Sequence, residues 1–222
     1  MQRKLNQIIS NWQKGTVRTS NSLRTDGYSD DLLSKYVKSK WLESFGFGAY
    51  KLYGNSIHWF GAIHALQTEL NSTIHVAGKS ALQINGLAHK WDTTLTITQT
   101  TKCGNYSHFL TDIVLDSITL KVSSPELAIM EMLLKVPDGE SYNEANLIME
   151  GLLTLRPKVV SKLLLECKSV KTKRLFLHLA EKQNHTWFRR LDLAKVNLGS
   201  GKRQIIKNGR LDSKYLITVP RE

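Results

Sequence analysis

The fold of the first fifty residues is indicated by the run SDDLLSKYVKSKWL at positions 29–42. Ser29 is a favoured N-cap residue, and Asp30 and Asp31 place negative charge beside the positive end of a helix. The apolar residues of the run recur at helical spacing and are Leu32, Leu33, Tyr36 and Val37. The run therefore predicts an amphipathic helix with a polar, lysine-bearing outer face.

Two shorter helices are predicted before this run. The first covers about residues 3–12, where apolar side chains are spaced for one helix face, and Gly15 follows it. Thr19 or Ser20 then caps a second helix that continues through Arg24.

After the run, two β-prone segments at 41–44 and 49–53 enclose the glycine-containing loop 45–48. Such an arrangement is typical of a β-hairpin. Helix, helix, turn, helix and hairpin follow one another in the order of a winged helix-turn-helix. We therefore predict an α+β protein with an N-terminal winged helix-turn-helix, residues 1–54, followed by a larger mixed α/β domain, residues 55–222.

The larger domain is expected to alternate helices and strands. The predicted helices cover about 57–70, 78–86, 127–136, 145–153, 157–167 and 171–182, and the predicted strands 73–76, 93–100, 109–115 and 118–122. Serines at 123–124 and Ser141, each with a glutamate close behind, predict capping boxes. Asn208-Gly209 between two β-prone runs predicts a closing type I′ hairpin.

In a winged helix-turn-helix, the second helix of the helix-turn-helix motif lies in the major groove of DNA. Here that helix is the one predicted from the run at 29–42. The side chains expected to point outward from the run at 29–42 are those of Asp31, Ser34, Lys35 and Lys38. Arg18 and Thr19, near the start of the preceding helix, and Lys51 on the hairpin are further candidates for phosphate contacts. The alternatives are a solvated charged face and a protein-docking module.

The balance of charge favours polyanionic partners. The 222 residues hold 31 Lys and Arg against 19 Asp and Glu, a net charge of +12. Residues 168–222 hold 14 basic and 4 acidic residues, a net of +10. This segment predicts a second basic patch, unless its charges only solubilise the surface. Its candidate members are Lys171, Lys173, Arg174, Arg189, Arg190, Lys202, Arg203, Lys207, Arg210 and Lys214.

Motifs for catalysis, metals and cofactors are not found in the sequence. The glycine-lysine segments at 78–80 and 199–203 lack the spacing of a phosphate-binding loop, and the seven histidines show no zinc motif. We expect no catalytic residues, no metal and no cofactor. Short apolar runs and the absence of an apolar leader predict no membrane segment. Cys103 and Cys167 are predicted to be free thiols of a cytoplasmic protein.

Several segments resemble one family. LLSKYVKSKWL at 32–42 and GFGAY at 46–50 resemble the winged-helix domain of AbiEi antitoxins, which belong to bacterial abortive-infection, phage-defence systems of type IV. IHVAGKSAL at 74–82 and the segments 148–157, 170–181 and 198–220 are similar to their C-terminal domain.

This resemblance implies a transcriptional repressor that binds inverted repeats of double-stranded operator DNA in its own operon. It also implies that the C-terminal domain counters a cognate nucleotidyltransferase toxin that acts on tRNA, without a stable complex. An RNA-binding protein that shields tRNA with its C-terminal basic face is the alternative. A third hypothesis, an enzyme that acts on the toxin or its substrate, has no motif in its favour.

Overall fold

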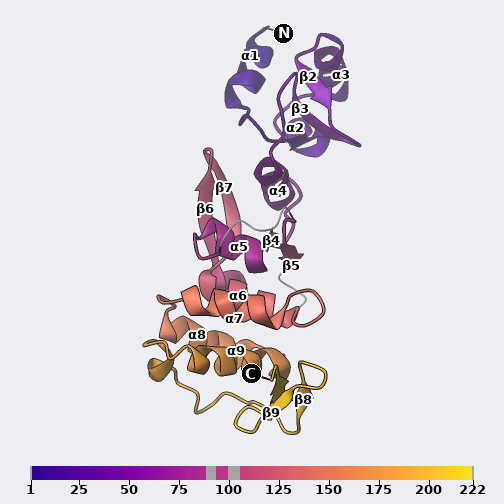
Figure 1. The fold of residues 1–222 in the computed structure, drawn as a ribbon. Coiled ribbons are helices and arrows are strands. Elements are labelled where there is room, and N and C mark those ends of the chain that lie inside the picture. The colour runs from indigo at the N-terminus through magenta and orange to yellow at the C-terminus, as the bar shows by residue number, and fades with distance from the viewer. Residues whose placement is uncertain (1, 89–93, 100–105, 222) are drawn as a thin grey trace. The chain divides into compact units, whose positions relative to one another are not determined.

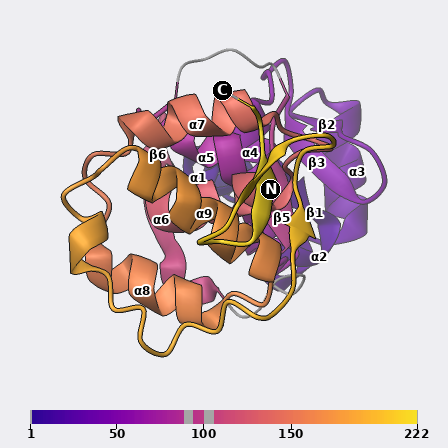
Figure 2. The same cartoon turned by 60° about the horizontal axis from the view of Figure 1, so that its bottom comes forward.

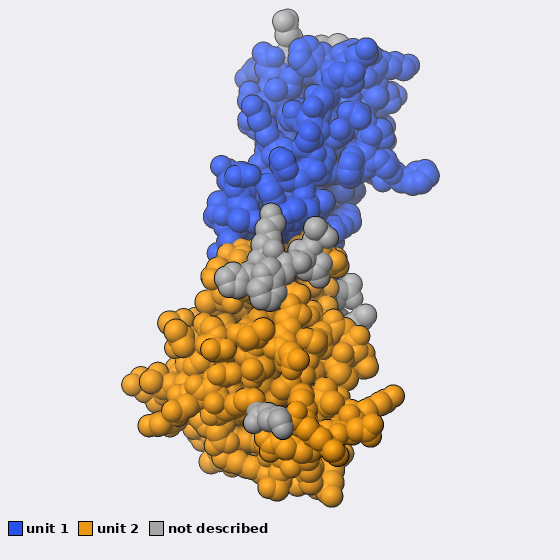
Figure 3. All heavy atoms as spheres, viewed as in Figure 1, with its two compact units in different colours: residues 1–74, 112–120 blue, residues 75–111, 121–222 orange. Residues whose placement is uncertain are grey.

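The computed structural model describes residues 2–88, 94–99 and 106–221, and its ribbon is drawn in Figures 1 and 2. The chain forms two compact units (Figure 3). Unit 1 comprises residues 1–74 and 112–120, and unit 2 comprises residues 75–111 and 121–222. The predicted 93–100 strand and Cys103 fall partly or wholly outside the described residues.

Unit 1 begins with a winged helix-turn-helix, which confirms the predicted α+β class and N-terminal domain type. Its elements are α1 (Gln2–Asn11), β1 (Arg18–Thr19), α2 (Ser20–Thr25), α3 (Asp30–Lys38), β2 (Leu42–Ser44) and β3 (Ala49–Leu52). The antiparallel sheet has the strand order β1-β3-β2. Thr19 caps α2 and Ser29 caps α3, each accepting a hydrogen bond from a backbone N–H three residues on.

One buried cluster joins all three helices to the hairpin. Leu23 and Leu33 are completely buried, and Trp12, Tyr36 and Leu42 are at most 5% exposed. Burying a large apolar side chain contributes roughly 1.5–3 kcal/mol. This cluster therefore fixes the orientation of α3 relative to the wing.

Helix α4 (Trp59–Thr68) groups with the winged helix, although the sequence suggested a division after residue 54. The winged helix itself does end near there, at Leu52. The reason for the larger unit is a close backbone approach: a Cβ on Gly61 would lie 1.9 Å from the carbonyl oxygen of Gly15. The helix predicted over 57–70 ends earlier, at Thr68, and Leu70 beyond it is 59% exposed.

A four-stranded sheet has the order β5-β4-β7-β6. Its strands are β4 (Ile74–Val76), β5 (Ile97–Gln99), β6 (Leu110–Leu115) and β7 (Ile118–Ser123). Strands β4 and β7 are parallel, with Val76 opposite Val122. Helix α5 (Gly78–Ile84) follows β4, and a 3₁₀ turn, η1 (Ser107–Phe109), precedes β6.

Unit 2 is built on packed helices. They are α6 (Pro125–Leu134), α7 (Tyr142–Gly151), α8 (Pro157–Glu166) and α9 (Val170–Lys182), followed by the 3₁₀ turn η2 (Phe188–Arg190). Helix α6 contacts α5, α7, α8 and α9, and is buried along most of its length. It therefore forms the centre of this unit.

The predicted capping boxes are only half correct. Ser124 and Ser141 do cap α6 and α7. The glutamates, however, do not reach back to the caps. Glu126 binds Arg156, and Glu144 pairs with Lys79 at 2.5 Å.

The C-terminal sheet differs from the predicted hairpin. Strands β8 (Arg203–Gln204), β9 (Arg210–Asp212) and β10 (Ile217–Val219) have the order β8-β10-β9, and β8 runs parallel to β10. Asn208 has a positive φ of 57°, but Gly209 does not, so the type I′ prediction is wrong. Gly209 is instead needed for packing, because a Cβ there would lie 2.2 Å from the carbonyl oxygen of Val219.

Candidate nucleic-acid interface

The outer face of α3 carries the side chains expected there. Asp31, Ser34, Lys35 and Lys38 are all exposed. Within the described residues, Lys35 and Lys38 form no side-chain hydrogen bond or ion pair. Both ammonium groups are therefore free to meet an external anion.

The backbone after α3 fixes that face in place. Trp41 donates its N–H to the carbonyl oxygen of Tyr36 at 2.9 Å, and Tyr53 donates to the carbonyl of Trp41 at 3.0 Å. These bonds tie the end of α3 to both strands of the hairpin. A helix whose inner side packs on a core and whose end is bonded in this way presents its outer side in a defined orientation.

The acidic residues at the start of α3 are partly neutralised. Asp30 accepts hydrogen bonds from the Arg24 guanidinium at 3.1 and 3.2 Å. Asp31 lies next to it and is exposed. The negative charge therefore lies at the N-terminal end of the helix, and the free lysines lie toward the C-terminal end.

Arg18 and Thr19 have structural roles in place of the predicted backbone contacts. Glu69 accepts hydrogen bonds from the Thr19 N–H at 3.0 Å and from the Arg18 guanidinium at 3.4 Å. Arg18 also pairs with Asp26 at 2.7 Å. A carboxylate of the same chain thus already occupies the N-terminus of α2, which the sequence suggested as an anion site.

Lys51 is engaged as well. It pairs with Glu43 on the neighbouring strand at 3.1 Å and donates to the carbonyl oxygen of Asn55 at 3.0 Å. Its side chain is only 17% exposed. The wing therefore presents an internally compensated ion pair instead of the predicted free cation.

The tip of the wing carries a residue that our sequence reasoning passed over. Phe47 is fully exposed, at 109% of its reference area, and Phe45 is 45% exposed. The signal was present in the sequence, because Phe47 stands between two glycines in a hairpin loop. A large apolar side chain at the apex of a hairpin has no core to enter.

The C-terminal basic set divides into two groups, and the first is internal. Arg174 is 2% exposed and donates to the carbonyl oxygens of Leu198 at 2.7 Å, Gly199 at 2.9 Å, Gly201 at 2.6 Å and Leu216 at 3.3 Å. Burial, with the nearby charge of Arg203, lowers the pKa of Arg174. Its role is to satisfy carbonyl groups of the C-terminal loops.

Lys173, on the same helix, is also buried, and the half-buried Lys171 is engaged within the chain. Lys171 donates to the carbonyl oxygens of Leu134 and Val136, at the end of α6. Lys173 is 5% exposed. The prediction of a surface basic patch is therefore wrong for Lys173 and Arg174, because α9 lies inside unit 2 over most of its length.

The remaining members of the set are exposed: Arg189, Arg190, Lys202, Arg203, Lys207, Arg210 and Lys214. Lys214 is bound to Glu181, whose pKa is lowered chiefly by the hydrogen bond from that ammonium, against the opposing effect of burial. Within the described residues, Arg190, Lys202 and Lys207 form no ion pair. A smaller basic surface thus remains in this segment.

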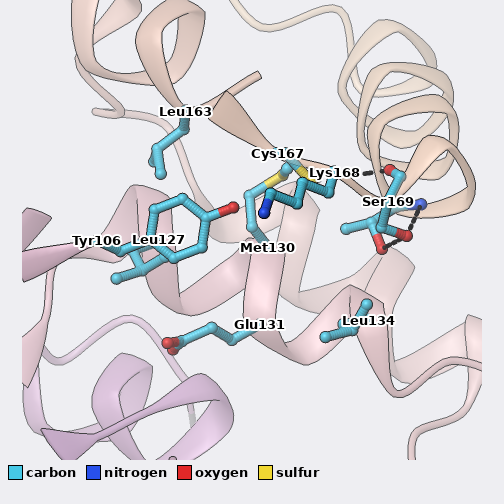
Figure 4. Close-up of a pocket in the computed structure, with 10 residues that line it drawn as sticks. Tyr106, Leu127, Met130, Glu131, Leu134, Leu163, Cys167, Lys168 and Ser169 are labelled. Carbon is cyan, nitrogen blue, oxygen red and sulfur yellow. Dashed lines mark hydrogen bonds between the residues drawn. The ribbon is translucent and has the colours of Figure 1, made fainter. Parts of the chain in front are cut away.

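Unit 2 also contains an apolar cavity of about 330 Å³ (Figure 4). Leu127, Met130 and Leu163 contribute to its wall, and Lys168 lies at the surface. The carboxylate of Glu131, on its edge, is already bonded to His75 at 2.9 Å and to other groups of the chain. The cavity therefore has mainly apolar walls, and the one carboxylate on its edge is held by other groups of the chain.

The buried histidines serve packing. His178 bonds to Tyr142 at 2.9 Å through Nε2 and to Asp212 at 2.6 Å through Nδ1, so it joins α7, α9 and β9. Among the described residues, no cluster of three or more histidine, cysteine or acidic side chains is arranged to hold a metal ion. In the same part of the chain, no helix has the length and apolar character needed to cross a membrane.

Comparison with protein families agrees with this architecture. Residues 1–93 match the family described as "Transcriptional regulator, AbiEi antitoxin N-terminal domain". Residues 82–220 match that described as "Transcriptional regulator, AbiEi antitoxin, Type IV TA system". The chain belongs to the AbiEi antitoxin family. The resemblance noted in the sequence is thereby confirmed for an AbiEi transcriptional regulator of type IV toxin–antitoxin systems.

A similar fold is also found among solved structures. The crystal structure of RV2827C protein from Mycobacterium tuberculosis matches with a TM-score of 0.66 and 13% sequence identity, covering 97% of this chain and 89% of that one. At this identity the match concerns the fold alone. No curated protein sequence matched the chain.

Proposed function

We propose that this AbiEi antitoxin represses its own operon by inserting α3 into the major groove of an operator with inverted repeats. The support is the exposed face of α3, on which Lys35 and Lys38 have no internal partner. Lysine ammonium groups neutralise phosphates or reach guanine, and the Ser34 hydroxyl can bond either bases or phosphates. Arg18, Thr19 and Lys51 are left out of this interface because each is bound within the chain.

The second part of the proposal concerns the toxin. We infer that unit 2 counters a cognate nucleotidyltransferase toxin without a stable complex and without enzymatic activity of its own. The family described as antitoxin supports the general role. The mainly apolar wall of the cavity in unit 2, where the Glu131 carboxylate is held by His75 and other groups, favours binding over catalysis.

The DNA-binding proposal is tested with fluorescence anisotropy on a labelled duplex taken from upstream of the gene. Binding is measured from low to moderate salt for the full chain and for Lys35→Ala and Lys38→Ala. Each substitution is expected to weaken binding and to reduce the slope of log affinity against log salt by about 1, since one phosphate contact is lost.

Lys158→Ala is the matched control, because Lys158 is an exposed lysine at the start of α8. It removes the same charge from a different surface and should leave the slope unchanged. If all three variants behave alike, net charge alone attracts the DNA, and the assignment to α3 is wrong.

A second function, RNA binding, is favoured by the exposed cations in the last part of the chain. Arg190, Lys202 and Lys207 lie within a segment of high positive charge and have no ion-pair partner among the described residues. Competition between the operator duplex and tRNA distinguishes the two functions. If tRNA binding is lost in the triple alanine variant while duplex binding is retained, the RNA function is supported; unchanged tRNA binding contradicts it.

A further inference from the structure

The tip of the wing is a tight loop with a defined backbone. Phe45 donates its N–H to the carbonyl oxygen of Ala49 at 2.8 Å, so three residues close the hairpin. Gly46 and Gly48, on either side of Phe47, have positive φ values of 76° and 66°. Such angles favour glycine and hold the intervening residue at the apex.

This tip is also anchored to the rest of the domain. Ser20, the first residue of α2, donates its N–H to the carbonyl oxygen of Gly48 at 2.7 Å. Strand β1 pairs with β3 directly below the loop, with Thr19 opposite Ala49. The position of Phe47 is therefore fixed relative to α2, and through the buried cluster relative to α3.

The exposure of Phe47 has no explanation in the folding of the domain. Single apolar residues are common at protein surfaces. Here, however, two phenylalanines share one loop, and one of them is fully exposed on an anchored apex. The ion pair between Glu43 and Lys51 neutralises the strands below, so the tip presents an apolar ring without net charge.

We propose that Phe47 is an apolar wedge that enters the minor groove beside the α3 site, inserts between two base pairs and bends the duplex. This inference rests on the proposed DNA binding. The free lysines of α3 supply charge complementary to DNA, and the wing belongs to the same rigid domain. Apolar side chains inserted between base steps unstack them and kink DNA by about 20–90°. Flexible pyrimidine–purine steps are therefore preferred beneath the wing.

The test uses the full chain and the promoter duplex described above, labelled at both ends for energy transfer. Phe47→Ala is expected to abolish the bend and weaken binding by about 10-fold, with an unchanged salt slope, because no phosphate contact is lost. Phe47→Leu should retain part of the bend. Leu70→Ala, the matched control, removes another exposed apolar side chain of unit 1 and should change neither quantity.

The possible failures are distinguishable. If the native chain binds tightly and Phe47→Ala bends DNA equally, the wedge is refuted and the DNA-binding function stands. If the native chain binds no DNA, the wedge and the proposed DNA-binding function are both refuted. If Phe47→Ala instead dissociates an oligomer in sedimentation, the ring contacts a second copy and the wedge is again wrong. Thermal unfolding is measured for both proteins, and an unfolding midpoint of Phe47→Ala equal to that of the native chain verifies that the variant is folded.

Discussion

Helices α3 and α9 each carry two cations three residues apart, Lys35 and Lys38 on the first and Lys171 and Arg174 on the second. On α3 both side chains are exposed and have no internal partner among the described residues. On α9 both donate hydrogen bonds to carbonyl groups of the same chain. The same spacing thus leaves two cations exposed at the surface of one helix and places two cations against backbone carbonyl groups in the other.

The difference comes from what surrounds each helix. Helix α3 packs one face against a small cluster and leaves the other in solvent, whereas α9 contacts α6, α7 and β10. In a surrounded helix, burying a cation costs free energy, and carbonyl or carboxylate oxygens that meet it offset that cost. Spacing places two side chains on one face, but neighbouring elements decide whether that face is a surface.

The largest expected effect is on Arg174. Arg174→Ala removes the side-chain donor of four carbonyl groups, of which that of Leu216 keeps a backbone donor, the N–H of Arg203. The substitution should lower the free energy of unfolding by about 4 kcal/mol. Arg174→Lys should recover only part of this, because one ammonium cannot replace the guanidinium fork. Urea denaturation measures both variants. Arg190→Ala, which removes an exposed arginine, is the control; if it costs as much as Arg174→Ala, the comparison of the two helices fails.

A smaller effect on the free energy of unfolding is expected at Glu126. This residue sharpens the comparison of α3 with α9, because its partner is a cation that is exposed and yet engaged within the chain. The carboxylate is 2% exposed and accepts two hydrogen bonds from the Arg156 guanidinium, whose side chain is 58% exposed. Burial alone would raise the pKa of Glu126, but the hydrogen bonds from the Arg156 side chain and backbone outweigh it and lower the pKa. Exposure alone therefore does not identify an available cation.

Glu126→Gln is expected to lower the free energy of unfolding by about 2 kcal/mol at pH 7. Because the pKa is lowered in the folded state, the stabilisation is present above the unfolded value of about 4.3 and is lost as the pH falls through the folded value. Denaturation of both proteins between pH 7 and 3 measures this. A difference that remains constant across this range would contradict the role of the charge.

The smallest effect is expected for Arg18, which lies in the winged helix-turn-helix and pairs with the carboxylates of Asp26 and Glu69. Arg18→Ala should lower the free energy of unfolding by about 1 kcal/mol, since its ion pairs are partly exposed. The salt slope of DNA binding should not change. Arg18→Ala is measured in the same salt-dependent anisotropy assay as the α3 variants. If the slope of log affinity against log salt falls by about 1, Arg18 also contacts a phosphate.

The winged helix was predictable because its signals are local. The caps Thr19 and Ser29, the apolar spacing of α3 and the glycine loop each depend on residues a few positions apart, and all are confirmed. Contacts between residues far apart in the sequence were not predicted. The contact of α4 with Gly15 depends on Gly61, whose role is a close backbone approach that no local pattern shows.

The C-terminal sheet shows the same limit. Asn208 and Gly209 are a strong local turn signal, yet β10 pairs with Arg203 and Gln204 in parallel, which requires a longer crossover. The candidate site was predicted in part for a similar reason. Lysine positions can be read from the sequence, but Glu69 and Glu43, which bind Arg18 and Lys51, come from other elements.

The parallel pairing of β8 with β10 has a consequence for how the protein is made. Strand β10 is the middle strand of its sheet, and the carbonyl oxygen of Leu216, just before it, is one of the partners of Arg174. During synthesis, α9 leaves the ribosome well before these groups do. The Arg174 guanidinium therefore gains all four carbonyl partners only after the segment from Leu198 to Leu216 has folded against α9.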